Sequence, residues 1–92
     1  MAITVYASEI LPGSEEVLHF GNSIEEVEKE GVEIFREIKL EDDRTDLPPC
    51  TIYAFDLDTP KLDDVLAILN ERKSLRDCVL RNRRVVKQVT VE

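Results

Sequence analysis

The 92-residue chain has little of what most catalytic and metal-binding sites require. It contains three glycines, two cysteines, one histidine and no tryptophan. So few glycines, none of them in a GxGxxG or Walker pattern, exclude the loops that hold nucleotide phosphates. Cys50 and Cys78 lie far apart with no CxxC pair, and His19 is the only histidine, so no zinc site is expected. We therefore expect no metal ion and no other cofactor.

Long apolar segments are absent as well. The longest run, Val65–Leu69, is far shorter than the roughly twenty residues of a membrane-spanning helix. The first ten residues include no basic side chain and reach Ser8 and Glu9 early, which is atypical of a secretory signal. Together with two unpaired cysteines, these features favour a cytoplasmic protein that makes no membrane contact.

Charge is plentiful but unevenly distributed. The formal net charge is −8, yet residues 1–71 hold 18 acidic and 5 basic side chains, whereas residues 72–92 hold 2 acidic and 7 basic ones. The C-terminal cations either form a patch that contacts a macromolecule or fold back beside the acidic segments. The candidate patch consists of Arg72, Arg76, Arg81, Arg83, Arg84 and Lys87.

The strands of the fold are predicted from alternating apolar residues. The length predicts a single domain, residues 1–92. Period-two alternation of β-forming residues predicts strands over 3–10, 50–57 and 84–91, the last of them after a turn at 81–83. The segment 50–57 is apolar on both faces, which is typical of a strand that is buried on both sides.

Two helices are predicted from capping residues and apolar periodicity. Ser23 followed by Glu26 forms a capping box, so a helix is expected to begin at Ser23 after an irregular or short helical lead-in over 14–20. Thr59 and Pro60 are suited to cap and begin a second helix. That helix has an apolar stripe made of Leu62, Val65, Leu66 and Leu69.

The segment that follows Gly31 has two interpretations. Gly31 is either a helix stop followed by a strand over 32–40, or a residue within one long helix over 23–39. The strand is favoured, and it gives an α+β, ferredoxin-like βαββαβ two-layer sandwich with a four-stranded antiparallel sheet and two helices on one face. With the long helix, the sheet must have a different set of strands.

In the favoured fold the helices cover one face of the sheet and leave the other open. Small aliphatic residues such as Val5 and Ile52 are assigned to the covered face, and aromatic residues to the open one. An exposed aromatic cluster usually marks a partner surface, so we expect a homodimer that pairs sheet to sheet. The proposed partner face consists of Tyr6, Phe35, Tyr53, Phe55 and Leu57. Base stacking on these rings, as in RNA binders, is disfavoured by the net negative charge.

One segment resembles a catalytic motif. Residues 53–59, an apolar strand that ends in Asp56-Leu57-Asp58-Thr59, are similar to the first motif of haloacid-dehalogenase-type phosphatases. The resemblance implies that Asp56 is a phosphoryl-accepting nucleophile and Asp58 a general acid. It also implies a parallel sheet, a later lysine and a late acidic pair at a magnesium ion. No such acidic pair follows on a later strand, and the similarity covers only about seven residues.

The sequence therefore predicts a small, non-enzymatic binding or regulatory domain. It is expected to act through protein–protein contacts and to associate with itself through the aromatic sheet face. A first alternative is an acidic inhibitor that mimics nucleic acid, which requires the carboxylates between Ser14 and Asp46 to line one face. A second alternative is the phosphotransfer activity implied for Asp56 and Asp58.

Overall fold

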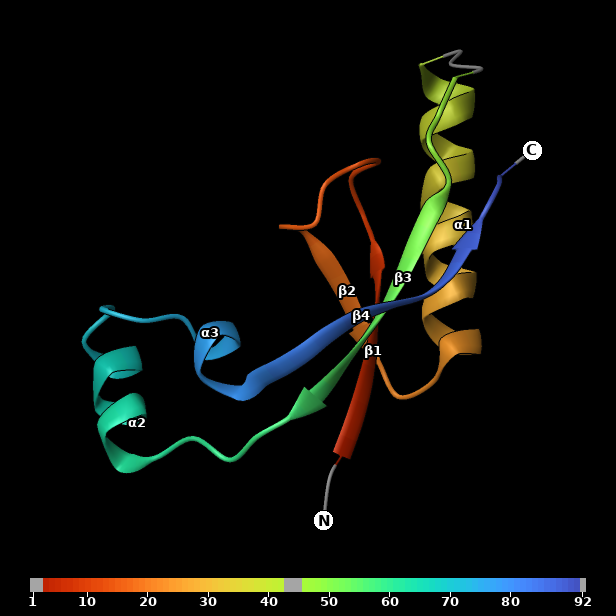
Figure 1. The fold of residues 1–92 in the computed structure, drawn as a ribbon. Helices are drawn as coiled ribbons and strands as arrows, with labels where there is room; N and C mark the ends of the chain where they lie inside the picture. The colour runs from red at the N-terminus through yellow and green to blue at the C-terminus, as the bar shows by residue number, and fades with distance from the viewer. Residues whose placement is uncertain (1–2, 43–45, 92) are drawn as a thin grey trace.

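The computed structural model describes residues 3–42 and 46–91, which form four strands and three helices (Figure 1). In chain order these are β1 (Ile3–Glu9), β2 (Leu18–Gly21), α1 (Ile24–Glu41), β3 (Cys50–Leu57), α2 (Leu62–Leu69), α3 (Leu75–Val79) and β4 (Leu80–Val89). The strands form one antiparallel sheet in the order β2-β1-β3-β4. The predicted α+β class and four-stranded antiparallel sheet are confirmed, and they are consistent with a ferredoxin-like sandwich. The order of elements differs from βαββαβ.

The difference arises in the segment around Gly31. Residues 24–41 form one continuous helix, so the strand predicted over 32–40 is wrong and the alternative of a single long helix is correct. The predicted helix start is confirmed, because the Ser23 hydroxyl accepts a hydrogen bond from the Glu26 amide at 3.2 Å. The Glu26 carboxylate in turn accepts one from the Asn22 amide at 3.1 Å.

Gly31 lies inside this helix because α1 approaches the sheet closely there. A Cβ atom at position 31 would lie 2.7 Å from the Cys50 Sγ and 3.0 Å from the Ser8 Cβ. A glycine in mid-helix costs about 1 kcal/mol relative to alanine, and packing of this kind overrides that cost. On either side of it, Val27 and Phe35 are completely buried.

The fourth strand of the sheet comes from a segment for which no strand was predicted. Residues 18–21 form β2, which pairs with β1 across a hairpin. The irregular or helical lead-in predicted over 14–20 is therefore wrong in its second half. The strand is only four residues long, too short for period-two alternation to be recognised in the sequence.

The register between β1 and β3 defines the two faces of the sheet. Tyr6 lies opposite Ala54, and Ala7 lies opposite Tyr53. Paired residues of antiparallel strands share a face, so Tyr6 lies on the same face as Ile52 and Ala54. The close approach of Gly31 to Ser8 and Cys50 shows that α1 covers this face.

The other face contains the second part of the core. Ala7, Tyr53 and Phe55 are buried there as one cluster, with the partly buried Val5, Leu18 and Leu80 packed around it. The assignment of Val5 to the helix-covered face was therefore wrong, since a shift of one residue in register exchanges the two faces of a strand.

Strand β4 lies at one edge of the sheet and is longer than predicted. It begins at Leu80, so residues 81–83 belong to the strand and do not form the predicted turn. The register between β3 and β4 shifts twice, between Ile52 and Tyr53 and between Ala54 and Asp56. Asn82 has a positive φ of 55° at the second irregularity. These β-bulges allow the strand to twist sharply across the sheet, as Figure 1 shows.

Helices α2 and α3 connect β3 to β4 and lie beyond one end of the sheet (Figure 1). Helix α2 begins at Leu62, with Lys61 rather than Thr59 at its N-cap, so the predicted Thr59 cap is wrong. The extended placement of these helices makes the molecule elongated, at 47 × 28 × 16 Å. The radius of gyration of 15.1 Å exceeds the roughly 12 Å of a compact domain of this length.

Candidate functional site

The five residues proposed as a partner face do not form one exposed surface. Phe35 is part of α1 and is completely buried, and Tyr6 is on the sheet face covered by that helix. Tyr53 and Phe55 are on the opposite face as predicted, but they are only 3% and 5% exposed. Leu57, at the end of β3, is 39% exposed. The predicted common, open aromatic face is thus wrong for four of the five.

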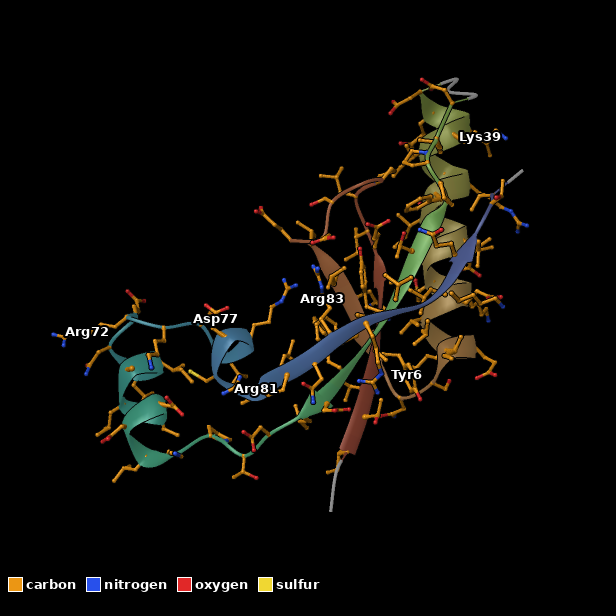
Figure 2. All side chains as sticks on the ribbon, in the orientation of Figure 1. Tyr6, Lys39, Arg72, Asp77, Arg81 and Arg83 are labelled. Carbon is orange, nitrogen blue, oxygen red and sulfur yellow. The ribbon has the colours of Figure 1, made fainter. Side chains whose placement is uncertain are left out.

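Arginine side chains cover the aromatic rings on the second face. The Arg83 guanidinium lies 5.7 Å from the centroid of the Tyr53 ring and is ion-paired with Glu15 (Figure 2). The Arg76 guanidinium lies 5.7 Å from the centroid of Phe20, which in turn lies 5.8 Å from Phe55. Both arginines hold the β1–β2 loop against this face. Arg83 does so through its ion pair with Glu15, and Arg76 donates hydrogen bonds to the backbone carbonyls of residues 15 and 16 in the same loop.

Glu9 adds a buried polar contact beside the same rings. Glu9 is 3% exposed, and its carboxylate accepts hydrogen bonds from the Tyr53 hydroxyl at 3.3 Å and the Thr51 amide at 3.2 Å. Burial, followed by the Glu9 charge, raises the pKa of Tyr53 above its ordinary value. Glu9, Thr51 and Tyr53 are bound to one another inside the domain, and these contacts give no indication of a catalytic role.

Most of the predicted basic patch is likewise used within the chain. Arg84 donates a 3.1 Å hydrogen bond to Asp56, and Lys87 is ion-paired with Glu28. Arg81 donates hydrogen bonds to three backbone carbonyls around α3, at residues 77, 78 and 80. With Arg76 and Arg83 engaged as described, the basic stretch folds back on acidic segments, which was one of the two expected arrangements. Arg72 points outward at the α2–α3 end of the molecule (Figure 2).

Asp56 and Asp58 do not adopt the arrangement implied by the phosphatase resemblance. The Asp56 carboxylate accepts hydrogen bonds from Asn82 at 2.8 Å and from Arg84. These hydrogen bonds, with Asn82 contributing most, hold the pKa of Asp56 below its ordinary value. Asp58 is exposed and accepts a hydrogen bond from the Thr59 amide. All strand pairs are antiparallel in the described residues, whereas the resemblance implies a parallel sheet.

The most unusual surface belongs to α2. Four of its five large aliphatic side chains are exposed, with exposed fractions of 71% for Leu62, 37% for Val65, 48% for Leu66 and 72% for Leu69. The side chains turned inward are Asp64, Ala67 and Ile68, which are half-buried. We call the four outward residues the α2 stripe. An amphipathic helix normally buries such a stripe, whereas this one is left exposed.

An open apolar groove lies beside α3. It has a volume of about 380 Å³, and no residue of α2 lines it. Its apolar walls include three half-exposed side chains, Phe20, Leu57 and Leu75. We call this the α3 groove, and its remaining lining residues are Val5, Gly21, Asn22, Arg76, Val79 and Leu80.

The sequence identified the α2 stripe but assigned it to the core. Periodicity shows that a helix has an apolar side; it does not show which way that side faces. The groove was missed altogether, because its residues come from all four strands and α3 and meet only in the folded chain. Leu57 alone connects the predicted partner face to this groove.

Sites for metals and thiol chemistry are also absent from the described parts of the chain. Residues 3–42 and 46–91 contain no group of three or more His, Cys, Asp or Glu side chains placed to hold a metal ion. Cys50 and Cys78 are free and buried. Burial is the largest cause that raises the pKa of Cys50, to about 11. Within the same residues, no helix has both the length and the apolar character that a membrane crossing requires.

Comparison with known proteins adds no relative. No protein-family model, no curated protein and no solved structure matches the chain.

Proposed function

We propose that this chain is a non-enzymatic protein-binding domain that acts through the α2 stripe. The observation that supports the proposal is the exposure of α2: Leu62, Val65, Leu66 and Leu69 lie at the surface, and only three of its residues are half-buried. Scattered apolar residues are common on protein surfaces, but four on one side of a single helix form a contiguous patch. Such a patch on a helix is a usual mode of recognition between proteins.

The energy available from the stripe is sufficient for binding. Full burial of a leucine or valine side chain contributes about 1.5–3 kcal/mol. Scaled by the exposed fractions of the four residues, burial of the α2 stripe contributes on the order of 3–7 kcal/mol. Part of this offsets the loss of free motion on association, so the surrounding surface must contribute as well.

The proposal includes a regulatory role in the cytoplasm. Two free, buried thiols support a reducing compartment, where disulfides are rare. Asp56 is engaged by Asn82 and Arg84, which supports the absence of phosphotransfer chemistry. Phosphate release from a generic phosphate ester by the purified chain, lost in Asp56→Asn, would contradict this part of the proposal.

Site-specific photo-crosslinking tests the binding surface directly. A benzophenone amino acid is placed at position 69 in the α2 stripe and, as a matched control, at position 40. Leu40 is 82% exposed at the far end of α1, so the two positions have similar solvent access. In extract of the source cells, we expect covalent adducts with a protein, including another copy of the chain, from position 69 and not from position 40.

Equal adduct yields at the two positions would contradict the proposal, because random collision labels any exposed site. Thermal unfolding followed by circular dichroism shows whether both labelled chains are folded. Both positions are exposed and helical, so neither label should lower the unfolding temperature by more than a few degrees.

A second function is favoured by the surface of α1. Five glutamates at spacings of three and four residues share one exposed side of this helix: Glu26, Glu30, Glu33, Glu37 and Glu41. Like charges at these spacings destabilise a helix by about 0.2–0.5 kcal/mol per pair, so the row opposes stability. It supports the alternative of a nucleic-acid mimic that binds a basic protein. Asp43, in the same acidic segment, lies outside the described residues.

Binding to a basic peptide tests this alternative. A lysine- and arginine-rich peptide should bind the chain with an affinity that falls steeply between 50 and 200 mM salt, as for a polyanion. The variant Glu30→Gln/Glu33→Gln/Glu37→Gln should weaken binding at least tenfold. The control Asp63→Asn/Glu71→Gln, which removes exposed carboxylates from the other end of the molecule, should not. Equal loss in both variants would indicate only a response to net charge.

A further inference from the structure

We infer that the partner of the α2 stripe is a second copy of this chain, and that the stripe of each copy occupies the α3 groove of the other. The inference rests on the proposed function, since it names the occupant of the same surface. It is supported by the coexistence of an unfilled apolar groove and an unburied apolar helix in one chain.

The groove and the helix are complementary in shape and character. The α2 stripe is convex, with leucine or valine at positions i, i+3, i+4 and i+7. The α3 groove is concave and is lined largely by aliphatic and aromatic side chains. A helix laid into an apolar groove, with anchors at these spacings, is a known geometry of protein recognition.

A chain does not fill its own groove with α2, because no α2 residue lines that groove. Helix α2 contacts α3, which forms a wall of the groove, and lies beyond it at the extremity of the molecule (Figure 1). Reciprocal exchange between two copies fills both grooves and closes the assembly with twofold symmetry. It also accounts for the elongated shape of the single chain.

The apolar area is adequate for a dimer. The α2 stripe, together with Phe20, Leu57 and Leu75 of the groove, comprises seven large apolar side chains that are 37–72% exposed. At roughly 100 Å² for each fully buried side chain, these expose on the order of 400 Å² of apolar area per copy. Interfaces are about 60% apolar, so this corresponds to roughly 650 Å² per partner, close to the usual size of a specific interface.

The charges beside the two surfaces are also complementary. Among the residues that the structure describes, Arg76 is the only charged one that lines the α3 groove, and its guanidinium donates to backbone carbonyls. Asp63, which flanks the α2 stripe, forms no side-chain hydrogen bond or ion pair with any residue of 3–42 or 46–91. Its carboxylate can therefore approach Arg76 of the second copy.

The oligomeric mass of the purified full chain tests the inference. Sedimentation equilibrium between 1 and 500 µM should give twice the monomer mass at the upper concentrations. Leu69→Glu, in the stripe, and Leu57→Glu, in the groove, should each weaken the dimer at least 30-fold. The control Leu40→Glu introduces the same charge at an exposed leucine away from both surfaces and should leave the mass doubled. If Leu57→Glu fails to fold by circular dichroism, Leu75→Glu replaces it as the groove variant.

Mixing the two variants distinguishes exchange from direct pairing of stripes. A chain with Leu69→Glu retains an intact groove, and a chain with Leu57→Glu retains an intact stripe. In the exchanged dimer the mixture therefore regains one of two contacts, so the mixture should associate more tightly than either variant alone. If stripe packs on stripe, the Leu57→Glu chain keeps an intact interface and dimerises by itself, and the mixture associates no more tightly than that variant alone, which would overturn the inference.

Different results would contradict the protein-binding function and the second copy as its partner. A purified chain that stays monomeric at 500 µM, while position 69 still crosslinks to another protein in extract, overturns the second copy as partner and leaves the binding function standing. A monomer without crosslinks overturns both. A dimer that survives Leu69→Glu overturns the exchange, because its interface must then lie elsewhere.

Discussion

The Arg83 guanidinium lies 5.7 Å from the centroid of the Tyr53 ring and is ion-paired with Glu15 on its other side. This one contact joins the two most prominent features of the sequence, its aromatic strand and its uneven charge. A basic C-terminal strand folds onto an acidic N-terminal loop, and the rings lie between them. Tyr53 and Phe55 are thereby buried by the chain itself.

Replacement of Arg83 should expose the Tyr53 ring. In Arg83→Met we expect a loss of about 1 kcal/mol of unfolding free energy, the sum of a weak cation–π contact and an exposed ion pair. Tyr53 should also become more accessible to acrylamide quenching, measured in a Tyr6→Phe background so that a single tyrosine reports. Arg72→Met is the control, since Arg72 is exposed and points outward. Unchanged quenching in Arg83→Met would show that other groups shield the ring.

The close approach at Gly31 predicts a destabilising substitution by a better helix former. In Gly31→Ala the new Cβ meets the Cys50 Sγ at 2.7 Å and the Ser8 Cβ at 3.0 Å. The overpacking should cost about 1–3 kcal/mol in a urea denaturation measurement, despite the higher helix propensity of alanine. Glu30→Ala, at an exposed neighbouring position, should change stability by less than about 0.5 kcal/mol.

The same contact predicts coupling between Gly31 and Cys50. The cost of Gly31→Ala should be smaller in a Cys50→Ala background, because the sulfur that the new methyl group meets is gone. Equal costs in the two backgrounds would mean that the backbone of α1, and not the thiol, resists the added atom.

The Cys50 thiol should react very slowly in the folded chain. Its pKa is raised to about 11, chiefly by burial, so the thiolate fraction near pH 8 is roughly 100-fold lower than for an ordinary cysteine. In a Cys78→Ala variant, iodoacetamide labelling followed by mass spectrometry should show no adduct at pH 8 until urea unfolds the chain. Rapid labelling without denaturant would show that the α1 face of the sheet opens frequently.

Ionisation of Tyr53 should destabilise the fold at high pH. Its pKa is raised above the ordinary value of 10.0 by burial and by the Glu9 charge, so the folded chain holds the phenolic proton more tightly than the unfolded chain. The contribution of Tyr53 to the free energy of unfolding is therefore complete below about pH 10, and it is lost as the pH rises above the pKa of the unfolded chain.

Alkaline titration of a Tyr6→Phe variant at 295 nm should place the Tyr53 midpoint above that of the same chain in urea. The matched comparison is Tyr6→Phe/Tyr53→Phe, whose stability should fall less between pH 9 and 12. The double variant removes the hydrogen bond to Glu9, so it should also be less stable near neutral pH by about 1–2 kcal/mol.

Much of the fold could be predicted from local patterns. The bounds of β3 follow from its continuous run of β-forming apolar residues, and the start of α1 follows from the Ser23 cap. Gly31 was ambiguous because glycine serves equally as a helix stop and as a point of close approach. Only the positions of Ser8 and Cys50 in the folded chain resolve which applies.

The candidate site was predicted less well, because it depends on relations between distant segments. The face on which Tyr6 lies is set by its pairing with Ala54, and no pattern within β1 contains that information. The Tyr53 ring is contacted by Arg83, thirty residues later in the chain. The outward direction of Leu69 depends on the position of α2 in the folded chain after β3 ends.

The irregular pairing of β4 with β3 has a consequence for behaviour in concentrated solution. An edge of ten residues with free backbone amides and carbonyls is a template for strand-by-strand fibre growth. Two breaks in register keep this template from being straight, so an incoming strand loses alignment after a few residues. We therefore expect the irregularities at positions 82 and 86 to disfavour polymerisation through this edge.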